Sequence, residues 1–151
     1  HLFYVFIHLS HMAFAFTKGS TRLRSFPKTA SVTITAGDLL IMTSGALATA
    51  LNNTTTTVVG IAVKGVASTD GDYATGGARL LVEVPADKSC VLSAPVANGS
   101  LLTTSIGVKF GLTSAGAVDF ADTTDVVVTC TDFISASEGL FSLDETAQWL
   151  S

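Results

Sequence analysis

Short apolar runs alternate with polar turns along most of this chain. From residue 31 onward, segments rich in Val, Ile, Leu and Thr are separated by Gly, Asp, Asn or Ser. Such runs, recurring at a spacing of about 8–12 residues, are typical of an all-β sandwich or barrel. The pattern therefore predicts an all-β fold, with a single compact β-barrel or β-sandwich body over residues 31–151.

The predicted strands are short and closely spaced. The four threonines at 54–57 are β-branched, which favours a strand over a helix. Residues 144–150 are compatible with a short terminal helix, and the pattern otherwise predicts almost no helix. The predicted strands are residues 31–35, 39–43, 46–50, 54–66, 78–84, 89–94, 101–104, 108–112, 117–120, 125–133 and 139–143.

The first 30 residues differ in texture from the rest of the chain and are predicted to form an extended N-terminal arm. Gly19, Ser20 and Pro27 argue against regular structure between residues 12 and 30. The arm therefore forms one unit, residues 1–30, ahead of the β body.

Residues 1–11 are apolar and aromatic, but they lack the basic region and the small-residue cleavage site of a signal peptide. Met12 followed by Ala13 resembles a natural start. Residues 1–11 are then a non-native leader, or alternatively a hydrophobic arm that pairs with a neighbour. No window of eighteen consecutive apolar residues occurs, so the sequence predicts no transmembrane helix and no membrane partner.

Charge is scarce in this chain and unevenly placed. Charged residues make up 13% of it, against about 25% in an ordinary soluble domain. A polar surface made of Thr, Ser, Asn and Gly is easily desolvated, which favours burial against other proteins over a monomer with a bland surface. No Asp or Glu precedes Asp38, so the first 37 residues carry a formal charge of +4 and the remainder −8.

This asymmetry predicts that the arm docks on something acidic, either nucleic acid or the acidic body of a neighbouring copy. The arm lacks an aromatic stacking pattern, so protein docking is favoured and no nucleic-acid partner is predicted. Arg22 and Arg24 alternate and would point to the same side of an extended arm. A disordered, solvated tail is the alternative. The predicted docking residues are Phe14, Phe16, Lys18, Arg22, Arg24, Phe26, Lys28 and Trp149, the last as an interface anchor.

The body lacks the side chains that most enzymes use. All three histidines lie within residues 1–11, and no dinucleotide or phosphate-binding glycine motif is present. Asp70 and Asp72 resemble part of a calcium loop, but its bidentate Glu is missing, which favours a solvated turn. Cys90 and Cys130 belong to no CxxC motif and are predicted to be buried free thiols, with a disulfide as the alternative. The sequence predicts no catalytic residues, no cofactor and no metal.

Several motifs follow one another in a particular order over residues 30–143. They are A-G-D-L at 36–39, a Gly turn and Ala/Thr strand at 45–50, V-G-I-A at 59–62, a hydrophobic strand at 79–84, and S-x-G-x-x-x-G-L-T-x-x-G-x-V-D at 105–119. In this order they resemble the small capsid decoration (cement) proteins of tailed bacteriophages. The segment ahead of Met12 and the low charge of the body depart from that family.

The resemblance implies a structural virion protein that binds the outer capsid surface and cements neighbouring capsid subunits. It implies a homotrimer at three-fold positions, with the major capsid protein and other copies of this chain as partners, and no catalytic residues. One alternative is a subunit that assembles by itself into a shell, tube or filament. A carbohydrate-binding β-sandwich is a further alternative, disfavoured because the body has few aromatic residues.

Overall fold

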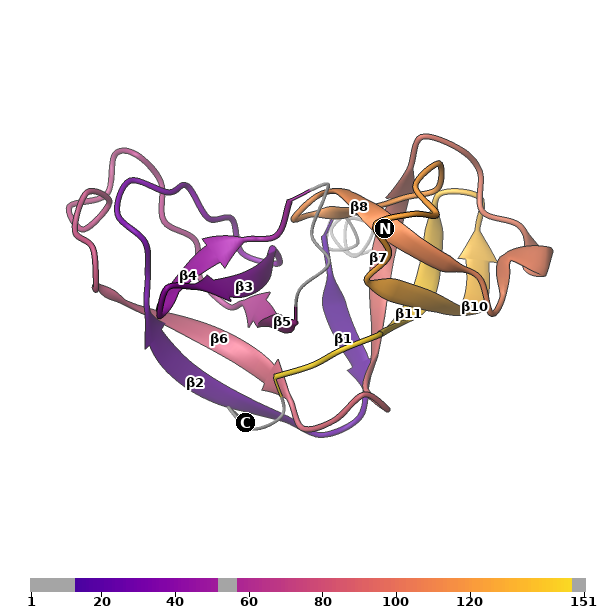
Figure 1. Ribbon diagram of the computed structural model, residues 1–151, viewed down its shortest axis with the longest axis horizontal. Helices are drawn as coiled ribbons and strands as arrows, with labels where there is room; N and C mark the ends of the chain where they lie inside the picture. Colours follow the sequence, from indigo (N-terminus) through magenta and orange to yellow (C-terminus); the bar gives the residue numbers. More distant parts are fainter. Residues whose placement is uncertain (1–12, 52–56, 148–151) are drawn as a thin grey trace, which may run out of the picture.

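The structure, a computed structural model, describes residues 13–51 and 57–147 and is nearly all β (Figure 1). These residues contain one short 3₁₀ turn and no α-helix. The predicted all-β barrel class is therefore confirmed. The elements are β1 (Ala15–Lys18), β2 (Thr21–Pro27), β3 (Leu39–Thr43), β4 (Ala46–Thr49), β5 (Val58–Ala62), β6 (Arg79–Pro85), β7 (Val91–Ala97), the 3₁₀ turn η1 (Thr103–Ser105), β8 (Lys109–Ser114), β9 (Ala117–Asp119), β10 (Val128–Ser135) and β11 (Glu138–Leu143).

Strands β7, β11, β10, β8 and β9 form a closed five-stranded barrel. The ring closes where β7 pairs in parallel with β9, at Val96↔Val118. Inward-facing apolar residues alternate along these strands, as a half-buried strand requires. Leu92, Phe110 and Phe141 are among the buried residues of the barrel core.

A second sheet has the strand order β2-β6-β5-β3-β4 and a core of its own. Its two edge strands, β2 and β4, come together just beyond the end of β2, where the Thr29 backbone N–H donates to the Leu47 carbonyl over 3.0 Å. β5 is buried along its whole length, with Ile61 in the barrel core and Val59 in the second core. Both faces of β5 are covered, which explains why its sequence is an unbroken apolar run.

The two sheets share one bent ribbon, in which β1 pairs with β7 in the first sheet and β2 pairs with β6 in the second (Figure 1). The bend lies at Gly19, which has a φ of +96° and packs directly over Cys90. The Ala86 backbone N–H donates to the Ser20 carbonyl over 2.9 Å and keeps the ribbon paired through the bend. Residues that are close in sequence therefore contribute to both sheets.

The N-terminal segment differs from its prediction. Residues 15–27 form two strands instead of an irregular arm: β1, which pairs with β7, and β2, which pairs with β6. The argument from Gly19, Ser20 and Pro27 was therefore wrong. Glycine and serine supply the bend between the strands. Pro27 is tolerated because it lies at the end of an edge strand, where no ladder hydrogen bond from its nitrogen is needed.

Three other predicted elements also differ. Residues 31–35 are not a strand and make only one bridge, from Ile34 to Val66. The predicted strand at 101–104 is replaced by η1, because the Ser105 hydroxyl accepts from the Leu102 N–H and closes a local turn. Residues 144–147 are not helical, and the rest of that predicted helix lies outside the described residues.

The predicted strand at 54–66 is shortened to β5, and its residues 54–56 lie outside the described part of the chain. The predicted strand at 39–43 matches β3, and the remaining predicted strands are present with shifted ends. Cys90 and Cys130 are both free and buried, as predicted.

Candidate functional site

The A-G-D-L turn at 36–39 is the joint between the two sheets. Its Gly37 N–H donates to the Ala62 carbonyl over 2.8 Å, and the Ala62 N–H donates back to the Asp38 carbonyl over 2.9 Å. The next residue, Leu39, donates its N–H to the carbonyl of Ala115, in the turn between β8 and β9, over 2.8 Å. Two motifs that are far apart in the sequence therefore meet here through their backbones.

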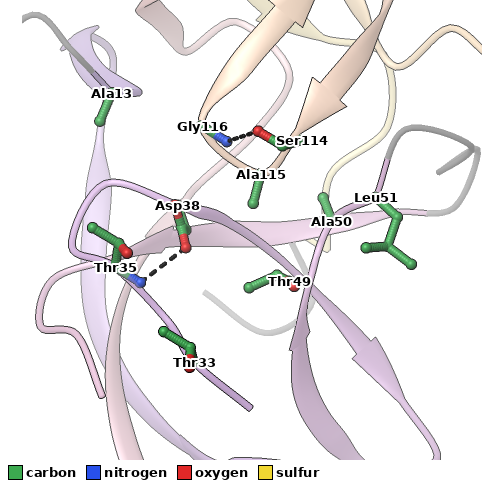
Figure 2. A pocket seen from close by; sticks show the side chains of 10 residues that line it. All are labelled: Ala13, Thr33, Thr35, Asp38, Thr49, Ala50, Leu51, Ser114, Ala115 and Gly116. Atoms are coloured by element: carbon green, nitrogen blue, oxygen red, sulfur yellow. Dashed lines mark hydrogen bonds between the residues drawn. The ribbon is translucent and has the colours of Figure 1, made fainter. Parts of the chain in front are cut away.

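A recess of about 340 Å³ opens beside this joint (Figure 2). Hydroxyl side chains of Thr33, Thr35, Thr49 and Ser114 line it, and Asp38 is the one ionisable residue among those lining it in the described part of the chain. The Thr35 backbone N–H donates to Asp38 Oδ2 over 2.9 Å. A single carboxylate among hydroxyls can accept hydrogen bonds but offers no second acid or base for proton transfer.

Burial raises the pKa of the half-buried Asp38 carboxyl above its ordinary value, and the hydrogen bond from Thr35 opposes that shift. Because folding raises the pKa of Asp38, protonation of its carboxyl stabilises the folded state. This contribution to the free energy of unfolding is complete below the unfolded-state pKa, and it is lost as pH rises through the folded-state pKa.

We expect the Asp38→Asn variant to lose this pH dependence while keeping an oxygen that accepts from Thr35. The stability of the wild type relative to Asp38→Asn should therefore increase as pH falls from 7 to 3.5, measured as the free energy of unfolding in urea. A difference that stays constant over this range would contradict the assignment.

The predicted docking residues differ in how far the structure exposes them. Phe14, Phe26 and Lys28 are buried inside this chain's own fold, with 2%, 8% and 1% of their surface exposed, so these side chains are not available to a partner. Phe16 is half-buried against the barrel core. The exposed predicted docking residues are Lys18, Arg22 and Arg24, and Trp149 lies outside the described residues.

Lys28 has a structural role that the sequence did not predict. Its Nζ donates to the backbone carbonyls of Tyr73 at 2.9 Å, Thr75 at 3.2 Å and Thr29 at 3.4 Å. Two of these acceptors lie more than 40 residues away in the chain. The ammonium therefore fixes the loop between β5 and β6 against the end of β2. Sequence reasoning could not find it, because only the fold brings that loop to the lysine.

Among the described residues, β2 is paired along one side only over residues 21–25. The Ser20 carbonyl accepts from Ala86 and the Lys28 N–H donates to Ala78, so even-numbered residues of β2 direct their backbone groups toward β6. Because these directions alternate along a strand, the backbone groups of Thr21, Leu23 and Ser25 point away from β6. The alternating R-L-R-S pattern is a sequence signal from which this strand could have been predicted, although the prediction for residues 12–30 was an irregular arm.

The loop that contains Asp70 and Asp72 is exposed, as expected for a solvated turn. Asp70 accepts from the Ala67 N–H over 2.9 Å, so its carboxylate stabilises the turn itself. A second cavity, of about 520 Å³, lies beside this loop, between Lys64 and Arg79. Within residues 13–51 and 57–147, no group of three or more His, Cys, Asp or Glu side chains is placed to hold a metal ion.

No protein-family model matches this chain, and no curated protein matches it. The described residues contain no helix with the length and apolar character needed to cross a membrane.

Proposed function

We propose that this chain is a non-catalytic structural protein of a virion, which binds the outer capsid surface and cements neighbouring capsid subunits. The observation that carries the proposal is the joint at Leu39 and Ala115. Two of the motifs that resemble the decoration proteins meet there, and each has a structural reason to be present. The low content of charged residues supports it further, because such a surface is cheaply desolvated on a partner.

Cementing requires a protein that binds the assembled shell in preference to the free subunits. At a concentration one hundred times its dissociation constant, each bound copy stabilises the assembled form by about 2.7 kcal/mol. The contribution is repeated at every site of the shell. The segment formed by β1 and β2 suits this role, because β1 lies in one sheet and β2 in the other. This segment also carries the exposed Lys18, Arg22 and Arg24. We place the partner-facing surface there, and a homotrimer is the assembly that the resemblance favours.

The test uses shells assembled from the major capsid protein of the genome that encodes this chain. We expect the purified protein to co-sediment with those shells and to raise their melting temperature in calorimetry. Light scattering should show a discrete oligomer of the protein alone, with a trimer expected.

Two results would contradict the proposal. Shells that sediment and melt unchanged at saturating protein would exclude cementing. Spontaneous growth of filaments or shells from this chain alone would favour the self-assembling subunit instead. Truncating residues 13–28 is not a clean test, because it removes a strand from each sheet.

A further inference from the structure

Among the residues that the structure describes, no strand pairs with the side of β2 that faces away from β6, and another extended chain can add to the sheet there. The outward backbone groups of Thr21 and Leu23 are not needed by β6, and Leu23 is 62% exposed. An edge strand with unused N–H and C=O groups is a template for β-augmentation, in which backbone hydrogen bonds supply affinity and side chains supply selectivity.

The open edge is short, and its far end is closed by the protein itself. Arg79 donates from Nη2 to the carbonyl of Ser25 over 2.8 Å, which occupies the last outward acceptor before Pro27. Pro27 has no N–H to offer. The outward groups that stay available are therefore the N–H and C=O of Thr21 and Leu23 and the N–H of Ser25, enough for a segment of about five residues.

Basic side chains select what can bind along this edge. Arg22 is exposed, and it shares a face of the strand with Arg24, whose guanidinium lies over the Phe26 ring at 5.5 Å from the centroid. Lys18 is exposed at the end of β1, just before the bend. Like charges directly opposite each other in a sheet are destabilising. Two β2 edges from two copies would bring these cations together, so self-pairing is disfavoured.

A partner strand with acidic residues two positions apart would be attracted to these cations instead of repelled. Alternate residues of a strand share one face, so two carboxylates at i and i+2 would lie along the face that carries Arg22. The residue between them would lie on the opposite face, beside Leu23, where an apolar side chain is favoured. The charge of Arg22 and the exposure of Leu23 therefore favour a partner segment in which acidic and apolar residues alternate.

We infer that the β2 edge accepts an extended segment of the partner protein, about five residues long, in which acidic and apolar residues alternate. This inference rests on the proposed function, since it names the chemistry of the partner at the surface proposed for docking. In this arrangement the N-terminal segment of this chain receives a strand from its partner.

The probe is an acetylated, amidated hexapeptide, TEVEVT, titrated into the full chain labelled for NMR. We expect amide shifts concentrated in residues 21–25, and at least tenfold weaker binding by the Arg22→Glu variant. The lysine peptide TKVKVT should not bind the wild type and should bind Arg22→Glu. Lys64→Glu, an equal charge change at an exposed lysine outside β1 and β2, should leave binding unchanged.

A hexapeptide N-methylated at both valines separates strand addition from simple charge attraction. It keeps the carboxylates but loses backbone donors, so we expect binding to be lost. Binding that survives methylation, or equal binding by Arg22→Glu, would overturn the inference. Shell binding that persists in Arg22→Glu, without peptide binding, would overturn it and leave cementing intact. Peptide binding without shell binding would leave the edge assignment intact and reject the proposed function.

Discussion

Replacing Lys28 with methionine is expected to lower the free energy of unfolding by about 2 kcal/mol, because three backbone carbonyls would lose a charged donor. Lys28 is 1% exposed, and its shortest hydrogen bonds go to Tyr73 and Thr75 in the loop between β5 and β6. Methionine fills a similar volume, so little of the loss should come from a cavity. Removing the charge also removes its desolvation cost, which partly offsets the lost hydrogen bonds.

The measurement is urea unfolding, combined with hydrogen exchange of the loop amides. Exchange at Tyr73 and Gly77 should accelerate more than exchange in the barrel, because the loop would lose its attachment to β2. Lys64→Met is the matched control: Lys64 is exposed, so its replacement should change stability by less than about 0.5 kcal/mol. A Lys28→Met protein as stable as the wild type would mean that the desolvation cost of the ammonium equals the energy of its hydrogen bonds.

Replacing Gly60 with alanine is expected to destabilise the fold by about 3 kcal/mol, at the upper end of what overpacking costs. A Cβ at this position would overlap the backbone carbonyl oxygen of Glu83 and lie 2.9 Å from Val82 Cγ1. The main obstacle is backbone in the neighbouring β6, which cannot move aside as a flexible side chain can. Relief would require β5 and β6 to separate, and β5 is buried between the two cores.

Gly71→Ala is the matched control, since a Cβ at Gly71 would meet no atom within 4 Å. Its unfolding midpoint should stay close to that of the wild type, whereas Gly60→Ala should unfold at clearly lower denaturant. Equal midpoints for the two variants would show that β5 and β6 can separate without cost. The glycine of V-G-I-A would then have no packing reason to be there.

Much of the strand content follows from local pattern. The segments that became β3, β6 and β11 carry β-branched and apolar runs bounded by turn residues, and their positions were predicted within about two residues. The prediction was wrong where long-range pairing overrode local signals. Residues 15–27 contain glycine, serine and proline, yet β6 and β7 supply hydrogen-bonding partners that make them strands.

The docking residues show the same division. The sequence placed Lys18, Arg22 and Arg24 in one basic segment, and that segment is exposed along β1 and β2. It could not show that Phe26 and Lys28, two and four residues beyond Arg24, turn into the interior. The burial of a side chain depends on what packs over it, and that is set by the loop and strands about 45 residues or more away.

The sequence by itself determined the all-β class, the scarcity of charge, the absence of histidine from the body and the basic character of the N-terminal segment, since these follow from composition and short-range periodicity. The tertiary structure decided which side of β2 the described strands leave unpaired, that Lys28 is buried, and how the A-G-D-L turn joins the two sheets. The physical reason is that each of these depends on contacts between residues distant in the chain, which the order of residues does not specify locally.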